Sequence, residues 1–140
     1  MTERDFQLDA RLNNDCLTLG ELLSGNRLLL HKNASVTWLI VVPQTDKTEL
    51  YELPKDQQQI LLDEINRLSA YLKERDNCDK INVATIGNVV SQLHIHIISR
   101  NISDPYWPGV VWGEQATKKW DQIEIQKIIR ELQAKQIISG

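Results

Sequence analysis

The stretch Gln92-Leu93-His94-Ile95-His96-Ile97-Ile98 is the most informative part of this 140-residue chain. Successive side chains of a β-strand point to opposite faces, so the apolar residues at 93, 95 and 97 share one face and Gln92, His94 and His96 share the other. The pattern predicts a strand over about residues 92–99 with its apolar face in a core. The two imidazoles, about 6.6 Å apart along the strand, are costly to bury unless polar groups meet them. We therefore interpret their face as a functional one.

The segment just before this strand, residues 87–91, reads Gly-Asn-Val-Val-Ser. A loop that starts with glycine can present main-chain N–H groups to an anion, and Asn88 and Ser91 add polar side chains. A neutral imidazole near pH 7 is a competent nucleophile toward phosphorus. The loop and the histidine strand together have what transfer of a nucleotidyl group to a protein histidine requires.

A metal site is the competing interpretation, because His-x-His is also a common pair of zinc or iron ligands. A third ligand would have to come from His31, Cys16, Cys78 or a carboxylate, and no second ligand pair stands at a recognisable spacing. We therefore predict no metal site. The two cysteines are isolated, as expected for free thiols in a reducing cytoplasm.

Outward from the motif, the chain predicts one α+β domain over residues 1–140, an antiparallel sheet packed with two main helices. The first fifty residues read as β-rich, and the continuous apolar run at 38–42 suits a central strand. Helical spacing runs from Lys55 to about Arg75 and returns from Trp120 to Leu132, within a C-terminal tail of residues 100–140. A further strand is expected at 80–86.

Composition narrows the function classes. The chain is 41% hydrophobic and 25% charged, as in globular domains, with a net charge of -3 that argues against general affinity for nucleic acid. No apolar run approaches the roughly 20 residues that span a bilayer. The charged N-terminus lacks the apolar core of a secretion signal. We expect a cytoplasmic protein that binds neither membrane nor nucleic acid.

With its flanks, the motif resembles the histidine triad (HIT) pattern His-φ-His-φ-His-φ-φ, in which φ is apolar. The chain is similar to bacterial HIT proteins of the diadenosine tetraphosphate hydrolase-like type. This similarity runs over most of the chain and is carried by Trp38-Leu39-Ile40-Val41-Val42-Pro43, Asn82-Val83-Ala84, residues 87–96, Arg100 and Trp107-Pro108-Gly109-Val110-Val111-Trp112-Gly113.

The resemblance implies a HIT-like fold, a homodimer and a purine nucleotide substrate. It implies that His94 attacks the α-phosphorus of a phosphoanhydride or phosphoramidate and that water then releases the nucleotidyl-histidine. It places His96 at the last motif position, which helps to hold the phosphates. No metal is essential to this mechanism, so no cofactor is expected and magnesium would act only as the counter-ion of the substrate.

The remaining site residues also follow from the resemblance. Asn82 matches an asparagine near the active site, and Asn88 and Val89 match positions that line the phosphates. Ser91 is expected to serve as a donor in the loop. Asn33, or less directly the neighbouring lysine, falls near the contact to the ribose.

Two positions depart from the family pattern. Gln92 replaces the first motif histidine, and Trp38 stands where many relatives carry an upstream histidine. Neither replacement can titrate near neutral pH. Slow turnover is therefore expected, and two alternatives stay open: a nucleotide-binding or regulatory module with negligible turnover, and a small metalloprotein that uses His94 and His96.

The sequence indicates less about the roles of the other histidine and of three tryptophans. His31 follows an apolar run, and a packing role at a strand end is the favoured interpretation. Trp107, Trp112 and Trp120 suit either stacking on an adenine or packing of the C-terminal tail.

Overall fold

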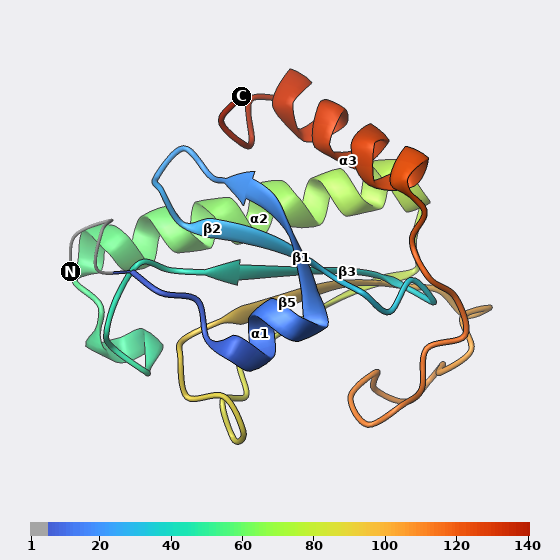
Figure 1. Cartoon of the computed structure of the whole chain (residues 1–140), viewed down its shortest axis with the longest axis horizontal. Coiled ribbons are helices and arrows are strands. Elements are labelled where there is room, and N and C mark those ends of the chain that lie inside the picture. The colour runs from blue at the N-terminus through green and yellow to red at the C-terminus, as the bar shows by residue number, and fades with distance from the viewer. Residues whose placement is uncertain (1–5) are drawn as a thin grey trace.

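A computed structural model of the protein describes residues 6–140 as a five-stranded antiparallel sheet with helices on both faces (Figure 1). The sheet order is β1-β2-β3-β5-β4. This confirms the expected α+β fold with an antiparallel sheet. The elements are α1 (Ala10–Asp15), β1 (Cys16–Glu21), β2 (Arg27–His31), β3 (Thr37–Val42), η2 (Leu50–Glu52), α2 (Lys55–Asp76), β4 (Lys80–Ala84), β5 (Ile95–Arg100) and α3 (Gln122–Ala134).

The strand β3 lies at the centre of the sheet, and all six of its residues are buried. It pairs with β2 on one side and with β5 on the other, where Ile40 faces His96. The first three strands form an antiparallel meander, within the first fifty residues that the sequence predicts to be β-rich. The apolar run at 38–42 is continuous because both faces of this strand are covered.

One face of the sheet packs against α2 and α3. The core on this side includes the side chains at 93, 95 and 97, together with Leu61, Leu68 and Ile128 from the helices. The Tyr71 hydroxyl of α2 donates to Glu131 of α3 at 2.9 Å and so joins the two helices. The apolar face predicted for the motif strand is therefore confirmed.

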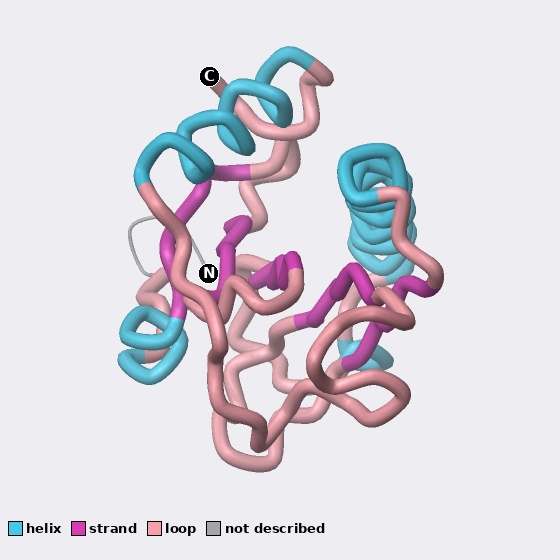
Figure 2. Tube along the Cα trace, turned by 90° about the vertical axis from the view of Figure 1, so that its right-hand side faces the viewer, coloured by secondary structure: helices cyan, strands magenta, loops and turns pink. Residues whose placement is uncertain are grey.

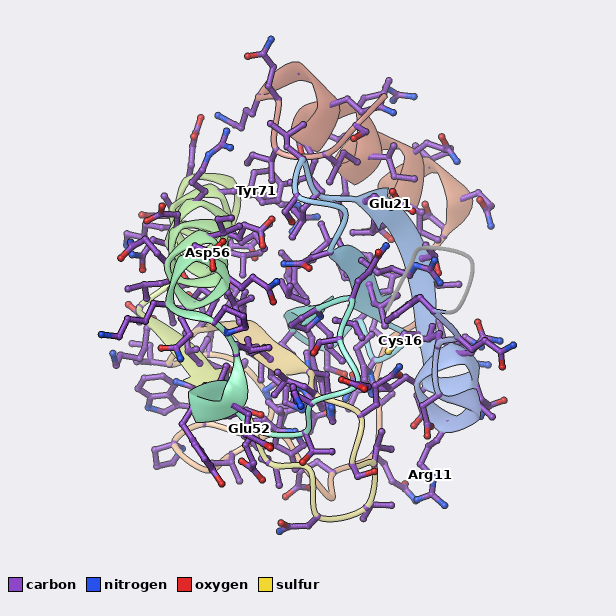
Figure 3. The ribbon with its side chains drawn as sticks, turned by 90° about the vertical axis from the view of Figure 1, so that its left-hand side faces the viewer. Arg11, Cys16, Glu21, Glu52, Asp56 and Tyr71 are labelled. Atoms are coloured by element: carbon purple, nitrogen blue, oxygen red, sulfur yellow. The ribbon has the colours of Figure 1, made fainter. Side chains whose placement is uncertain are left out.

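The opposite face holds the polar side of the motif. Trp38, Ile40 and Ile98 form its core with Leu12 from α1 and Val111 from the C-terminal tail. Figure 2 shows the long helix α2 on one side of the strands and the short helix α1 on the other. Figure 3 likewise places Arg11, on α1, across the molecule from Asp56 and Tyr71 of α2.

Several predicted boundaries differ from the structure. Phe6 and Leu8 belong to no strand, and the six-residue helix α1 follows them, begun by Asp9, whose carboxylate accepts from the Arg11 N–H. A helix this short has no apolar repeat to recognise. The strand β5 begins at Ile95 instead of residue 92, and β4 ends at Ala84 instead of residue 86. Residues 85–94 therefore form a longer loop than the sequence indicates.

The C-terminal helix also starts later than its apolar pattern. Trp120 precedes α3, because Asp121 forms a capping box with Glu124 and so fixes the first turn at Gln122. No helix in the described part of the chain has both the length and the apolar content needed to cross a membrane.

The cysteines are both free and buried. Burial, reinforced by the neighbouring Asp15 carboxylate, raises the pKa of the Cys16 thiol to about 12. This thiol therefore stays protonated and unreactive at neutral pH.

Candidate active site

The ring of His94 is oriented by the main chain of its own loop. Its Nδ1 lies 2.7 Å from the carbonyl oxygen of Gln92. Because a carbonyl only accepts hydrogen bonds, Nδ1 must carry the proton. In the neutral ring, Nε2 then keeps its lone pair. His94, which is 6% exposed, is thus held in the tautomer that a nucleophile requires.

The ring of His96 is held in the opposite tautomer. The indole Nε1–H of Trp38 donates to His96 Nδ1 at 2.9 Å. Burial, with smaller effects of the neighbouring His94 and His31, lowers the pKa of His96 to about 3. His96 is therefore neutral at pH 7 with its proton on Nε2, and that nitrogen serves as a hydrogen-bond donor.

An aromatic cluster surrounds the two imidazoles. The His94 and His96 ring centroids are 4.9 Å apart, and Trp112 meets His96 edge-on at 5.2 Å and Trp38 at 5.9 Å. His31 stacks flat on Trp38, with 3.9 Å between centroids and 8° between planes. Trp112 thus comes from the tail into the site, rather than packing elsewhere.

The packing role at a strand end that the sequence favours for His31 is confirmed, but its position beside the motif histidines was not anticipated. It ends β2 next to β3, so the strand pairing puts its side chain beside Trp38. The Asn33 N–H donates to its Nδ1 at 3.0 Å, and burial lowers the pKa of the His31 ring. The alternation of side chains along β2 puts position 31 on the same face as position 29. This alternation is the sequence signal that could have placed His31 on this face.

Gln92 is close in sequence to the imidazoles but uses its side chain elsewhere. Its Oε1 accepts from the Asp9 N–H at 2.8 Å, and its Nε2 donates to the Gln7 carbonyl at 2.9 Å. Both polar ends of the amide are therefore engaged by the N-terminal segment. Its main-chain carbonyl serves His94 instead.

A small polar cavity of about 110 Å³ adjoins His94. Ser91 and Gln92 line it, with Gly87 at the start of the loop and Glu49 from the segment between β3 and α2. Gly87 has a φ of +67°, in the left-handed region that glycine adopts without strain. The loop thus lines this cavity next to His94.

Other predicted loop residues are more peripheral. Asn88 and Val89 are exposed, Val89 by 74%, and neither lines the small cavity. Any contact that they make with a phosphate would come from the main chain or from the rim of the loop.

Asn82 lies on the same face as the imidazoles. On β4 it pairs with Ile98, and Ala84 pairs with His96, so its side chain points to the His96 side of the sheet. The Arg100 guanidinium donates to Asn82 Oδ1 at 3.0 Å and is itself held by Asp104. This contact fixes the orientation of the amide, so that its NH₂ remains available as a donor.

Asn33, predicted near the ribose, is 5% exposed. Its Nδ2 donates to the Tyr106 hydroxyl at 3.1 Å and its Oδ1 accepts from the Ser35 N–H at 3.0 Å. The amide therefore organises the loop between β2 and β3, although the residue does line the larger cavity described next.

The larger cavity, of about 950 Å³, borders the aromatic cluster. His31, Trp38 and Trp112 contribute to its wall, and residues of α1, of the β2–β3 loop and of the tail complete it. Its charged lining residues are Arg11, Asp15, Lys32, Glu114 and Lys119. Aromatic faces and cations are the groups that suit a nucleobase and its phosphates.

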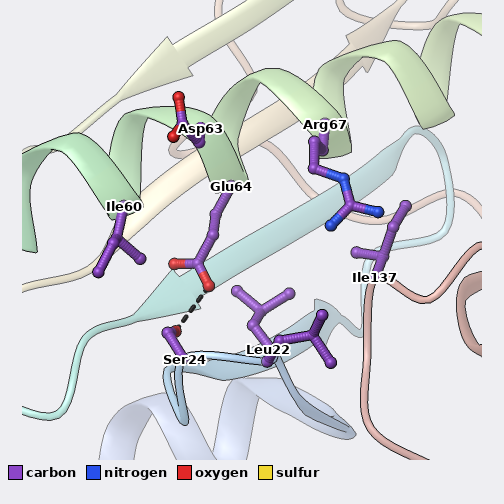
Figure 4. A pocket seen from close by; sticks show the side chains of 8 residues that line it. Leu22, Ser24, Ile60, Asp63, Glu64, Arg67 and Ile137 are labelled. Atoms are coloured by element: carbon purple, nitrogen blue, oxygen red, sulfur yellow. Dashed lines mark hydrogen bonds between the residues drawn. The ribbon is translucent and has the colours of Figure 1, made fainter.

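A separate cavity of about 330 Å³ lies between α2 and the β1–β2 turn (Figure 4). Leu22, Ile60 and Ile137 line it, and Glu64 receives a hydrogen bond from Ser24 at 2.6 Å. Burial raises the pKa of the Glu64 carboxyl, although the Ser24 and Asn26 hydrogen bonds oppose this effect. None of the predicted site residues lines this cavity. Within residues 6–140, no three His, Cys, Asp or Glu side chains gather as a metal-binding group.

Comparisons with known proteins agree with this geometry. A family model described as the HIT domain matches residues 24–102. A histidine triad protein from Marinobacter aquaeolei is 41% identical over 94% of this chain and 98% of its own, with a TM-score of 0.86. Those from Bradyrhizobium japonicum (38% identity, 94% and 98% coverage, TM-score 0.85) and Sinorhizobium meliloti (36%, 95% and 98%, 0.88) are similar to it as well. No curated protein matches the chain. Since the family model covers more than half of the chain, and similar histidine triad structures cover nearly all of it, the protein belongs to the histidine triad (HIT) family.

Proposed function

We propose that this HIT protein is a nucleotide hydrolase or nucleotidyl transferase that cleaves a phosphoanhydride or phosphoramidate through a covalent nucleotidyl-His94. HIT proteins are generally nucleotide-binding hydrolases or transferases. The observation that carries the proposal is the 2.7 Å contact between His94 Nδ1 and the Gln92 carbonyl. It leaves the Nε2 lone pair free in a buried, partly apolar setting that favours attack on phosphorus.

The reaction has two steps in this proposal. The Nε2 lone pair of His94 attacks the α-phosphorus, a P–N bond forms, and the bond from phosphorus to the leaving group breaks with its electron pair. The leaving group takes a proton from solvent. Water then attacks the same phosphorus and gives up a proton to solvent, and the P–N bond breaks with its electron pair returning to Nε2. The nucleoside monophosphate departs, and His94 regains its neutral form.

Charge that develops on the phosphoryl oxygens needs donors that are already in place. His96 supplies Nε2–H, because the indole of Trp38 occupies its other nitrogen. The oriented NH₂ of Asn82 and the main chain of the 87–91 loop are the further donors in this proposal. His96 acts in this role as a neutral donor, because its pKa lies far below 7.

We place the nucleoside in the 950 Å³ cavity. Its wall of His31, Trp38 and Trp112 suits stacking on a purine, and Arg11 and Lys32 add positive charge near its rim. A dinucleoside polyphosphate is one substrate of this class, as the resemblance to the diadenosine tetraphosphate hydrolase-like branch suggests.

A second candidate function follows from the lack of acid–base groups in the site. Both amide ends of Gln92 are engaged by main-chain groups, and Trp38 acts only as a donor, so the site has little acid–base capacity. A nucleotide-binding or regulatory module with negligible turnover would share this geometry.

The test is to trap the covalent intermediate. The protein is mixed with a panel of dinucleoside polyphosphates, aminoacyl-adenylates and nucleoside phosphoramidates, quenched within one turnover and examined by mass spectrometry. We expect one nucleotidyl group on the peptide that contains His94. Tight nucleotide binding with no adduct and no product for any substrate would favour the regulatory module.

We also propose a homodimer. The strand β4 is an edge strand of the sheet, and Val83 on it is 49% exposed. An unpaired apolar edge is a natural site for pairing with a second copy. Sedimentation at micromolar concentration should give a species of twice the 16.1 kDa chain mass, and a lone monomer would contradict the proposal.

A further inference from the structure

Gln92 lies outside the β-ladder that holds the rest of the motif. Main-chain pairing of β5 starts at Ile95 with β3 and at His96 with β4. The carbonyl that orients the His94 ring thus belongs to a loop residue, whose position the sheet does not fix. Some other contact must fix it.

The side chain of the same residue provides that contact. Gln92 Oε1 accepts from the Asp9 N–H at 2.8 Å and Nε2 donates to the Gln7 carbonyl at 2.9 Å. These two bonds match the donor and acceptor of an extended main chain, as a neighbouring strand would. An amide side chain carries its donor and its acceptor on one carbon, as a peptide group does.

The N-terminal segment that receives these bonds is itself anchored. Phe6 is 7% exposed in the core of the catalytic face, and the Arg27 guanidinium lies 4.9 Å above its ring. At the other end of the segment, Asp9 caps α1. Helix α1 in turn contributes Arg11 to the lining of the 950 Å³ cavity. The segment therefore connects the wall of the nucleotide cavity to the catalytic loop.

We propose that Gln92 is a positioning residue: its amide clamps the N-terminal segment to the catalytic loop and thereby fixes the carbonyl that sets the tautomer and orientation of His94. The effect on turnover rests on the function proposed above, while the clamp itself does not. In this view Gln92, at the first motif position, holds the catalytic loop in place and does not carry a proton.

The chemistry of substitutes follows from the two bonds. Glutamate at position 92 has only acceptors when ionised, so it would repel the Gln7 carbonyl while keeping the size of the side chain. Alanine removes both bonds. Histidine offers one donor and one acceptor, but its rigid ring cannot direct them to the Gln7 carbonyl and the Asp9 N–H as the amide does.

The experiment removes the clamp from either side. Gln92→Ala deletes the side-chain partner, and Asp9→Pro deletes the N–H donor at a residue whose φ of -52° and ψ of 137° a proline can adopt. Asp9→Ala is the matched control, because it loses the same helix cap but keeps the N–H. Each variant and the Gln92→Ala, Asp9→Pro double variant are compared with the wild type.

We expect kcat to fall about tenfold in Gln92→Ala and in Asp9→Pro relative to Asp9→Ala, in line with the loss of a partly buried hydrogen bond. KM should change less than about threefold, and the double variant should be no slower than the slower single one, since both changes break the same contact. The pH profile should keep its shape in Gln92→Ala, because no titrating group is lost. Additive losses, or a vanished limb of the pH profile, would overturn the proposal.

Two readouts do not depend on turnover. In Gln92→Ala, exchange of the Asp9 amide hydrogen should accelerate, and ¹⁵N spectra of the His94 ring should show a smaller share of the Nδ1–H tautomer. If the wild type proves to have no activity, these measurements still decide on the clamp. An Asp9 amide that stays equally protected, with an unchanged His94 tautomer, would refute it.

Discussion

The contact between Trp38 and His96 makes a sharp prediction about the second imidazole. Trp38→Phe removes the N–H that donates to His96 Nδ1 at 2.9 Å and keeps an aromatic ring beside His31 and Trp112. A buried acceptor that loses its donor costs about 1–3 kcal/mol. If the variant retains its fold, the Nε2–H tautomer of His96 loses that much of its free-energy advantage over the Nδ1–H tautomer.

The consequence for chemistry can be estimated from this energy. Once free of the indole, Nδ1 can take the proton, so His96 no longer presents Nε2–H in every molecule. A loss of roughly 1.4 kcal/mol in the transition state lowers the rate about tenfold. Removal of a donor that favours the neutral ring also raises the pKa of His96 above its wild-type value of about 3.

The chain offers a matched control. The indole N–H of Trp112 is buried and has no hydrogen-bond partner among residues 6–140, although its ring touches the same His96. Trp112→Phe therefore removes the same atom without breaking a hydrogen bond. Single-turnover kinetics between pH 4 and 8, with ¹⁵N spectra of the His96 ring, compare the two variants.

We expect slower nucleotidyl transfer at saturating substrate and a changed His96 tautomer in Trp38→Phe. Trp112→Phe should keep the wild-type His96 tautomer, and because Trp112 also lines the proposed nucleoside cavity, any loss there should appear in substrate affinity rather than in the rate at saturation. Equal effects of the two substitutions would mean that the aromatic packing matters and the hydrogen bond does not. A Trp38→Phe protein with the wild-type rate and an intact Nε2–H tautomer would refute the reasoning.

Further predictions concern the nucleophile, the need for metal, acid stability and the leaving group. His94→Ala should abolish turnover while nucleotide affinity stays within about tenfold, because the phosphate contacts come largely from other groups; full activity would remove His94 from its role. Turnover should persist in EDTA, since the proposed donors are protein groups, and loss of activity that zinc alone restores would indicate a metal site. Because burial holds the pKa of His96 near 3, below the value of about 6.5 in the unfolded chain, the unfolded state takes up the proton first. Stability should therefore be constant above pH 6.5 and fall below it by up to about 1.4 kcal/mol per pH unit, measured by urea denaturation between pH 7 and 5, with a flatter slope in His96→Asn. In a series of nucleotide esters, the rate of nucleotidyl transfer should fall steeply as the pKa of the leaving group rises, and a flat series would reveal a general acid.

Much of the fold follows from two patterns in the sequence. The apolar run at 38–42 predicts a central strand, and the alternation at 93–97 predicts one apolar face in a core; both are confirmed. The functional role of the opposite face stays a prediction. Helix α2 follows its apolar spacing to within one residue of the predicted end. These features succeed because burial on one or two faces leaves a local signature in the sequence.

The partners of the polar side chains left no such signature. Alternation places His96 on a face, but the indole that fixes its tautomer comes from a strand whose register the sequence does not reveal. Gln92 meets the main chain of residues more than 80 positions away. Main-chain partners cannot be inferred from residue type, so the sequence indicates that Gln92 can form hydrogen bonds but not with which groups.

The arrangement of the two imidazoles is compatible with the proposed nucleophile in a motif with one histidine fewer. Each ring has one nitrogen fixed by a group that does not titrate: a carbonyl for His94 and an indole N–H for His96. The tautomers of both rings are thus set without a third imidazole, and Gln92 contributes main-chain and amide contacts instead of a proton. What the site lacks is an acid: His96 is neutral far below pH 7, and Nδ1 of His94 is committed to the carbonyl. Under the proposed mechanism, we expect this arrangement to weaken protonation of the leaving group much more than attack on phosphorus, and so to favour substrates whose leaving groups are stable as anions.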